Sequence, residues 1–496
     1  MEVFSNLLMG FQVALTPVNF LFALGGVIIG QVVGILPGLG PIVTIAVLLP
    51  FTYNLDPIAA IVAFSGIYYG SQFGGAISAI LVNAPGTEAA IITAMEGYPM
   101  ARKGQAGRAL AAAAISSFVG GIIGTVLLTV LSGPITYLVV AFAAPEYLAL
   151  MIFALVCISG FSENTTLPKC CFSICVGLAI GTIGMDSTSG AIRLTFGNLN
   201  LYEGISFVIL AIGMFALAET FRNLHRETAD HPTHKMVIDD RVMLSKEEML
   251  NILPTQIRSS ISGFFIGVLP GVGSTTSTPL AYLAEKSLYK KGDWGNGEIR
   301  GVAAGESSNN SCAMGALVPL LTMGIPGSGT TAIMLSAFMI LGIQPGPLLF
   351  QNNPEMVWGL IASFFIGTCI LLAINLPLVR YCAKLVQIPG EILFLSVLLL
   401  CVVGAYSVSQ RTFDIWMILL FGIIGLFFSK AKLPLTPCLV SLLLGDMMEV
   451  NLARSVVICN HSVMEFIQRP IVAVFLVLAV LVLVGPRVYR LVKRSK

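Results

Sequence analysis

The sequence predicts an all-α polytopic membrane protein with about 11–12 transmembrane helices in two repeats of opposite topology. Of the 496 residues, 56% are hydrophobic and 10% are charged, whereas soluble domains carry about 25% charged residues. The apolar runs, such as residues 471–484, are continuous, and a membrane β-barrel would instead alternate polar and apolar residues. A phrase that occurs twice, at residues 34–41 (GILPGLGP) and 267–274 (GVLPGVGS), predicts the two repeats.

The first repeat is expected to occupy residues 1–221. It begins with a hairpin near residues 20–50, whose tip is the first phrase, and continues with a broken helix near residues 58–100. A second phrase, residues 83–87 (NAPGT), breaks this helix, because proline lacks an amide proton and glycine lacks a side chain. At membrane depth, the freed backbone groups must be buried in protein or line a polar cavity.

The most polar part of the chain, residues 222–258, is expected to be a cytoplasmic linker between the repeats. No Lys or Arg precedes Arg102, and Arg102, Lys103 and Arg108 then come close together, so the positive-inside rule places their loop in the cytoplasm as well. Between the two loops lie apolar stretches near residues 109–132, 135–160, 171–190 and 203–221. This even number of crossings agrees with both loops lying on one side.

The second repeat, residues 259–496, is expected to begin with a hairpin at residues 259–285. Arg258 precedes this interval and Lys286 follows it, and the interval is too short for two crossings of about 20 residues each. The chain must therefore enter and leave from the same side, with the phrase at residues 267–274 as the tip. A broken helix near residues 300–341 follows, and its break is the phrase GIPGSGTT at residues 324–331.

Charge placement indicates that the two repeats have opposite orientations. In the first repeat, the loop between the phrases has no Lys or Arg, and the loop after the second phrase is basic. In the second repeat this order is reversed. Two hairpins that enter from opposite faces are expected to meet near the midplane, and broken helices in matching positions of two halves indicate the binding site of a secondary transporter.

The candidate binding residues lie at these phrases. Helix N-termini at the breaks present free amide donors and a positive dipole end, which suit an anionic substrate. Unwound carbonyl and hydroxyl oxygens suit Na⁺, so a site for this metal ion is expected at the same phrases. The alternative is that the glycines only allow close helix packing. The candidates are Pro37, Gly38, Leu39, Gly40, Asn83, Thr87, Gly271, Val272, Gly273, Ser274, Thr275, Ser328, Thr330 and Thr331.

A polar run in the second repeat, residues 305–311 (GESSNNS), adds Ser307, Asn309 and Asn310 as candidate lining for the substrate or ion. Consecutive polar residues are costly in lipid and normally face a cavity or a partner. The alternative is a polar helix start at the cytoplasmic edge, because Arg300 is close. Glu88 directly follows the phrase at residues 83–87, and it is either an ion or proton ligand or a first-turn acid that the helix dipole favours.

An enzyme is not expected. The sequence contains no His-Glu-x-x-His, and residues 271–275, which have some likeness to a phosphate loop, lack its lysine. No cofactor is therefore expected, and transport would be driven by a gradient of Na⁺ or H⁺. The alternative is a channel-like or scaffold membrane protein without coupled transport.

Several phrases together resemble the large membrane subunit of the tripartite tricarboxylate transporters: residues 34–41, 66–70 (GIYYG), 97–104 (GYPMARKG), 315–322 (GALVPLLT), 324–328 and 344–348 (QPGPL). The resemblance covers nearly the whole chain. It implies an ion-coupled importer of di- or tricarboxylates in the bacterial inner membrane, with a periplasmic solute-binding protein and a small membrane subunit as partners. It also implies an elevator-type movement of the hairpin core. Glu88 and Gly305 depart from the family pattern, so the resemblance does not identify the carboxylate.

Overall fold

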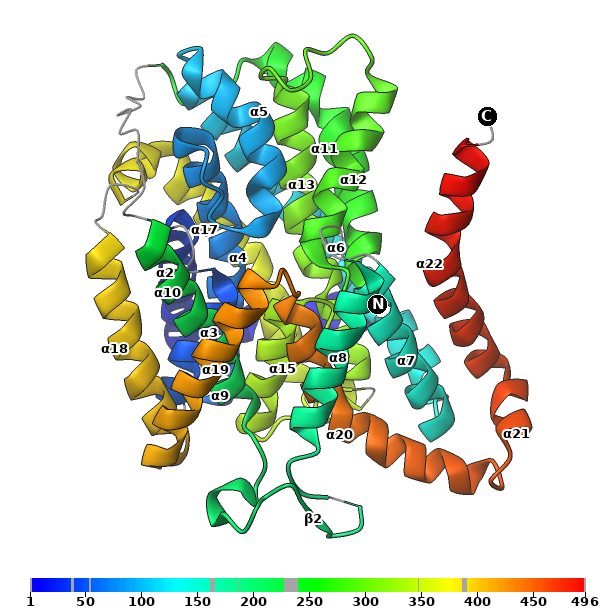
Figure 1. The fold of residues 1–496 in the computed structure, drawn as a ribbon. Helices are drawn as coiled ribbons and strands as arrows, with labels where there is room; N and C mark the ends of the chain where they lie inside the picture. Colours follow the sequence, from blue (N-terminus) through cyan, green and yellow to red (C-terminus); the bar gives the residue numbers. More distant parts are fainter. Residues whose placement is uncertain are drawn as a thin grey trace.

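The computed structural model of the chain describes residues 2–36, 40–52, 55–160, 166–186, 188–226, 240–346, 348–385 and 390–494. Nearly all of these residues are helical, and the strands among them are the antiparallel pair β1 (Gly184–Met185) and β2 (Ile192–Arg193). Figure 1 shows the helices gathered into one body, with α22 standing at its side. The predicted all-α class is confirmed.

The described residues of the first half of the chain form fourteen helical segments. Prolines stand in the first turn of α2, α3, α4 and α8, where the missing amide proton costs nothing. The segments are α1 (Glu2–Ala14), α2 (Pro17–Ile35), α3 (Pro41–Leu48), η1 (Leu49–Thr52), α4 (Pro57–Val82), η2 (Glu88–Ala90), α5 (Ile91–Arg102), α6 (Ala106–Val140), α7 (Ala144–Gly160), α8 (Leu167–Gly181), η3 (Leu199–Leu201), α9 (Phe207–Ala211), η4 (Ile212–Leu217) and α10 (Ala218–Arg226).

The second half of the chain contains helices throughout its described residues. They are α11 (Lys246–Val268), α12 (Gly273–Leu288), α13 (Ile299–Gly315), α14 (Leu317–Met323), α15 (Gly329–Ile340), α16 (Leu349–Asn352), α17 (Pro354–Leu385), α18 (Gly390–Ser409), α19 (Thr412–Lys430), α20 (Leu435–Ile458), α21 (Val463–Gln468) and α22 (Pro470–Arg494).

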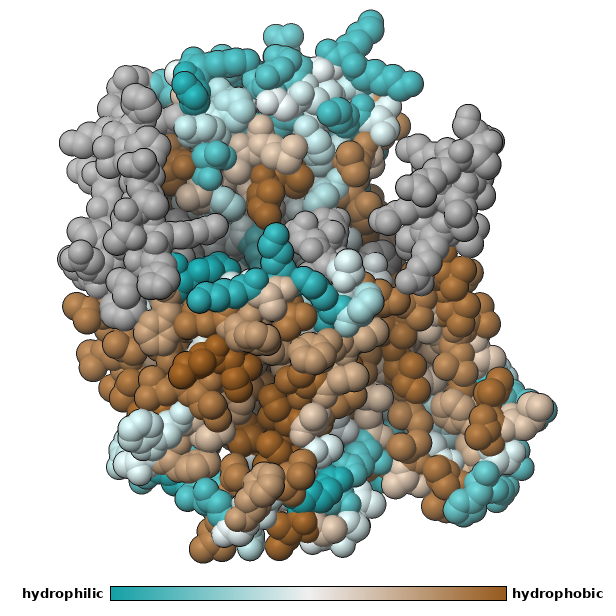
Figure 2. Space-filling view, viewed as in Figure 1, coloured by the Kyte–Doolittle hydropathy of each residue, from teal (hydrophilic) through white to brown (hydrophobic). Residues whose placement is uncertain are grey.

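Long apolar helices confirm that the chain is a polytopic membrane protein. Shorter apolar helices, among them α7, α8 and α15, accompany them, and Figure 2 shows a broad hydrophobic band between hydrophilic ends of the molecule. The number of about 11–12 crossings stays a prediction. Among the described residues, five helices are long and apolar enough to cross a membrane alone: Pro17–Ile35, Ala106–Tyr137, Pro354–Pro377, Thr412–Lys430 and Leu435–Ile458.

Helices α2 and α4 pack backbone against backbone because glycines line their contact. A Cβ placed on Gly30 would lie 2.4 Å from the carbonyl oxygen of Ile67, and one on Gly34 would lie 2.3 Å from that of Ser71. A real Cβ cannot approach so closely, so only glycine fits at these positions. Residue numbers rise together along both helices, which therefore run parallel.

Helices α11 and α13 repeat this arrangement. A Cβ on Gly263 would lie 2.5 Å from the carbonyl oxygen of Ser308, and one on Gly267 would lie 2.3 Å from that of Cys312. Gly34 and Gly267, which open the two copies of the repeated phrase, thus occupy matching places at the ends of matching contacts. In Figure 1, α4 and α5 run toward the upper end of the molecule, whereas α13 and α15 run away from it. The division of the chain into two inverted repeats stays a prediction.

Helices α11 and α12 are antiparallel neighbours joined by residues 269–272. Gly271 and Gly273 have φ angles of 74° and 65°, a left-handed conformation that glycine adopts without strain. The start of α11 and the end of α12 both lie at the upper end of Figure 1, as does the loop after α5. Helices α2 and α3 flank residues 37–39, which lie outside the described residues.

One predicted boundary is wrong. Helix α6 continues through residues 132–135, where two separate stretches were expected, with Pro134 inside the helix. Helix α11 begins at Lys246, within residues 222–258, because Ser245 and Glu248 form a capping box that starts a helix before the apolar residues. The cytoplasmic linker stays a prediction.

Two ion pairs fasten segments that are distant in the sequence. Arg193 of β2 donates to both carboxylate oxygens of Glu449 in α20, at 2.6 and 3.0 Å. Arg469, just before α22, pairs with Glu146 of α7 at 2.5 Å. These pairs hold the loop after α8 and the last helix against the body.

We expect Gly30→Ala to destabilise the protein by about 1–3 kcal/mol, the usual cost of overpacking, because the added methyl group collides with the α4 backbone. The measurement is the apparent melting temperature of the detergent-solubilised protein. Gly25→Ala is the matched control, since a Cβ at this neighbouring position of α2 meets no atom within 4 Å. Equal melting temperatures for the two variants would contradict the backbone contact.

Candidate functional site

Each half of the chain contains a helix that stops at a Pro-Gly phrase and resumes after it. Helix α4 ends at Val82, Asn83 follows in a left-handed conformation with φ of 55°, and the chain resumes helical structure at Glu88. Helix α14 ends at Met323, and Gly324 follows with φ of 69°. Helix α15 then starts from Ser328, whose amide donates to the Thr331 hydroxyl at 2.7 Å.

The phrases of each half touch one another. A Cβ on Gly86 would lie only 1.7 Å from the carbonyl oxygen of Gly34, so the break after α4 lies against the end of α2. In the second half, a Cβ on Gly273 would lie 3.6 Å from the Cβ of Ser328. The start of α12 therefore lies beside the start of α15.

The phrases also meet across the two halves. The Thr278 hydroxyl of α12 donates to the carbonyl oxygen of Ala89 in η2 at 3.3 Å. A Cβ on Gly329, at the start of α15, would lie 3.0 Å from Ile42 of α3. The described breaks and helix starts thus gather in one region of the molecule.

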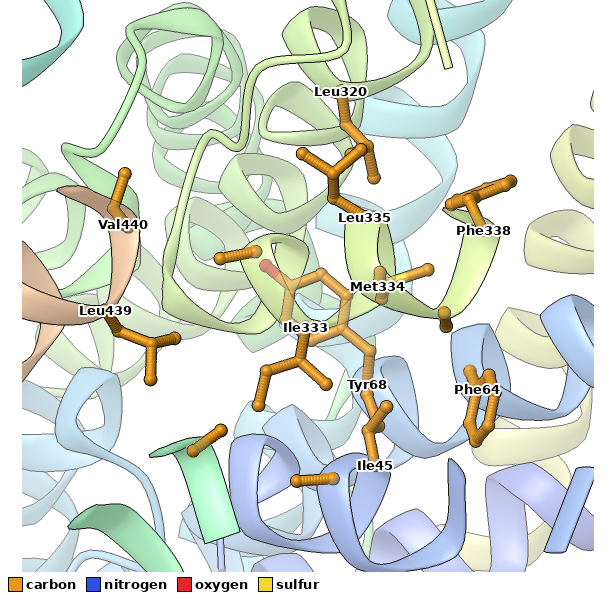
Figure 3. Close-up of a cluster of buried hydrophobic side chains, with 14 of the residues drawn as sticks. Ile45, Phe64, Tyr68, Leu320, Ile333, Met334, Leu335, Phe338, Leu439 and Val440 are labelled. Atoms are coloured by element: carbon orange, nitrogen blue, oxygen red, sulfur yellow. The ribbon is translucent and has the colours of Figure 1, made fainter. Parts of the chain in front are cut away.

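Apolar side chains enclose this region on the side of α3 and α15. Figure 3 shows Tyr68 of α4 beside Ile333 and Met334 of α15, with Ile45 of α3 below the ring. Tyr68 is 2% exposed, and its hydroxyl lies within interaction range of Ser328. The ring therefore joins one broken helix to the break of the other.

The polar run of α13 lies in the middle of this packing. Residues 306–311 are all fully buried, and they lie within the helix and not at its start, which contradicts the alternative of a polar helix start at the edge. Both side-chain polar atoms of Asn309 lack a hydrogen-bond partner among the described residues, as do Oδ1 of Asn310 and the hydroxyls of Ser311 and Thr87. Each unpaired buried group costs about 1–3 kcal/mol. These atoms are therefore available to a ligand or to water.

The predicted site residues fall into four groups. Thr87, Gly273 and Ser328 lie in the gathered region, and Asn309 and Asn310 are buried in α13, which packs against α12 and η2. Ser307 instead donates to Ala303 of its own helix, and its backbone packs against Gly120 of α6. The third group comprises residues at or next to the breaks with varied exposure: Gly40, Asn83, Gly271, Val272, Ser274, Thr275, Thr330 and Thr331. The fourth group, outside the described residues, is Pro37, Gly38 and Leu39.

That these residues bind a substrate or ion stays a prediction. For Glu88 the structure gives a position but not a role. Glu88 is exposed and stands in the first turn of η2, as a first-turn acid would. Among the described residues, no group of three or more His, Cys, Asp or Glu side chains could hold a metal ion. A Na⁺ site would therefore depend on backbone, hydroxyl and amide oxygens, together with single carboxylates.

Sequence reasoning missed three side chains that meet deep in the packing. Glu306 of α13 accepts hydrogen bonds from Thr93 of α5 and from Ser117 of α6. Glu306 stood within the polar run and could have been singled out as its one carboxylate. Thr93 and Ser117 are isolated hydroxyl residues in helices, and no local pattern distinguishes them.

We expect Asn309→Leu to raise the melting temperature of the ligand-free protein. Leucine has a similar volume, and the substitution removes two unpaired buried polar atoms that cost about 1–3 kcal/mol each. Asn352→Leu, at an exposed position of α16, is the control for the same chemical change. A melting temperature for Asn309→Leu below that of the wild type would show that the amide is paired in the folded protein.

The chain is similar to known proteins over most of its length. Residues 20–440 match the Tripartite tricarboxylate transporter TctA family. An Agrobacterium vitis protein described as "Uncharacterized 52.8 kDa protein in TAR-I ttuC' 3'region" is 41% identical over 474 residues, which cover 95% of this chain and 94% of the relative. Another from the same organism, "Uncharacterized protein in TAR-II ttuC' 3'region", is 36% identical over 212 residues, which cover 42% of this chain and 88% of the relative. No solved structure matches.

Proposed function

The chain belongs to the Tripartite tricarboxylate transporter TctA family, and on that premise we propose that it imports di- or tricarboxylates across the bacterial inner membrane, driven by a Na⁺ or H⁺ gradient. Membership of the family implies that the chain is the large subunit of a tripartite tricarboxylate transporter. Its proposed partners are a periplasmic solute-binding protein, which delivers the carboxylate, and a small membrane subunit.

The observation that carries this proposal is the buried, unpaired side chain of Asn309 in α13, the helix that packs against α12, α14 and η2. Its amide offers both a donor and an acceptor in a region closed to lipid. Helices α12 and α15 both start in this region, and their first amide groups have no partner within the helix. Such helix starts favour anions, so the substrate carboxylates are proposed to bind between these helix starts and Asn309.

An elevator-type movement is supported by a difference in height between two groups of helices. In Figure 1, the start of α8 and the ends of α10 and α19 lie about midway up the molecule, whereas α5, α11 and α12 continue to its upper end. Charged groups gather at this middle level: Lys169 donates to the carbonyl oxygen of Ala431 at 2.6 Å, and Arg222 pairs with Glu219 at 2.5 Å.

Charged side chains of this kind normally mark the edge of the hydrocarbon layer. The helices that carry the chain breaks would then extend beyond the cytoplasmic edge of the other helices. We propose that this difference corresponds to an inward-displaced position of the breaks, and that import moves them between this position and one nearer the outside.

The test uses the chain reconstituted into vesicles with both partner subunits. Uptake of labelled di- and tricarboxylates is measured with a Na⁺ gradient, with a pH gradient and with neither. We expect uptake to depend on at least one gradient and to stop when ionophores collapse both. Uptake that persists without any gradient would contradict coupled transport and favour a channel.

In the same vesicles, Asn309→Leu is expected to reduce uptake at least tenfold, equivalent to about 1.4 kcal/mol of lost binding or transition-state stabilisation. Asn352→Leu should transport as the wild type does. Since Asn309→Leu is also expected to be the more stable protein, lost uptake could not be attributed to unfolding. Wild-type uptake by Asn309→Leu would exclude the amide from the site.

A further inference from the structure

Glu306 is a fully buried carboxyl group in the centre of α13. One of its oxygens accepts a hydrogen bond from the Thr93 hydroxyl of α5, and the other accepts from the Ser117 hydroxyl of α6 at 2.9 Å. Both partners are neutral. The side chain therefore joins three helices without meeting a basic group.

Charged groups on the neighbouring helices are occupied elsewhere. Arg258 of α11 binds Glu285 of α12 at 2.7 Å, and Arg108 of α6 pairs with Glu248. Glu96 of α5 accepts from Tyr282 and from the backbone after α12.

The elements packed against α13 carry further titratable groups, and α13 itself carries two more. Among the described residues, none of these groups forms a hydrogen bond or an ion pair with the Glu306 carboxyl group, whose partners are the Thr93 and Ser117 hydroxyls. Besides the groups already named, the titratable groups on α13 and on the elements packed against it are Tyr68, Tyr69, Glu88, Tyr98, Arg102, Tyr137, Lys246, Glu247, Lys286, Arg300 and Cys312.

A carboxylate in this position needs a compensating positive charge. Moving an isolated ion into a protein interior costs several kcal/mol even after relaxation, and two neutral hydroxyl donors at about 0.5–1.5 kcal/mol each do not offset that cost. A bound proton or a bound alkali-metal ion would remove the unbalanced charge. The described side chains provide no other source of positive charge at Glu306.

Oxygen atoms that could complete a cation site lie next to Glu306. Asn310 stands one turn further along α13, donates to the backbone oxygen of Glu306 at 2.9 Å, and leaves its own Oδ1 unpaired. A small cavity between α4, α6 and α17 reaches Ser117 and Asn375. It has room for about one water molecule, which could connect Glu306 to a path for the cation.

We propose that Glu306 is the coupling-cation site of this transporter: it binds one monovalent cation, H⁺ or Na⁺, on the outer side and releases it in the cytoplasm. The inference rests on the proposed function, since it requires ion-coupled uptake. The inference goes beyond the proposed function in two ways. It names a specific residue outside the Pro-Gly phrases, and it states how the charge of that residue is balanced. Cation binding makes the carboxyl neutral, and cation release restores the carboxylate.

The experiment compares Glu306→Gln with the wild type in vesicles that contain both partner subunits. Glutamine keeps the size and the hydrogen-bonding capacity of the side chain but has no charge to neutralise. We expect Glu306→Gln to lose its response to one gradient, and the gradient that no longer drives uptake identifies H⁺ or Na⁺ as the ion. Glu247→Gln, at an exposed position of α11, should respond as the wild type does.

Two further measurements keep the test decisive. Glu306→Asp retains a carboxyl group and should retain coupling, with a changed ion concentration or pH for half-maximal uptake. If Na⁺ is the ion, it should raise the melting temperature of the wild type in detergent but not that of Glu306→Gln. The reason is that a ligand stabilises a folded protein only by binding to it.

The inference is overturned if wild-type uptake is ion-driven and Glu306→Gln responds to both gradients as the wild type does. It is also overturned if Glu306→Gln does not fold and Glu306→Asp has wild-type ion dependence. Wild-type uptake whose rate is independent of both gradients would instead overturn the proposed function itself.

Discussion

The contact between glycine-lined helices is the constraint on which the rest of this structure depends. Helix α2 lies against α4, and α11 lies against α13, so closely that a methyl group on Gly30 or Gly267 would collide with a carbonyl oxygen. In a membrane, such contacts replace the hydrophobic driving force that is absent between apolar helices. They also place the end of α2 beside Gly86 in the break after α4, and the end of α11 beside Cys312, directly after the polar run of α13.

The packing explains how polar groups persist in so apolar a protein. Backbone groups freed at a break are tolerated at membrane depth only within protein or beside a cavity, and here the breaks touch each other. Toward the periphery, charged side chains are paired, as Arg258 is with Glu285 and Arg469 with Glu146. In the centre, the Asn309 amide has no hydrogen-bond partner among the described residues, and the Glu306 carboxyl group has two neutral donors and no basic partner there. Such buried groups are what we expect of a binding site before its ligand is bound.

Local chemistry predicted much of this arrangement. Composition predicted the class, and the Pro-Gly pairs are sufficient to end helices, as at Val82 and Met323. What local chemistry could not provide was long-range pairing and helix rotation. Ser307 was a candidate ligand because it stands in the polar run, but it is turned toward its own backbone. Thr93 and Ser117 became relevant only when α5 and α6 were seen to meet at Glu306.

The central claim is that the chain breaks of the two halves enclose one carboxylate site beside Asn309. The most direct measurement is a density map of the complete transporter in lipid, recorded with and without a carboxylate that it transports. The account predicts ligand density between the Asn309 side chain and the starts of α12 and α15, and its disappearance without the carboxylate. Ligand density elsewhere, with the same water or side-chain density around Asn309 in both maps, would contradict it.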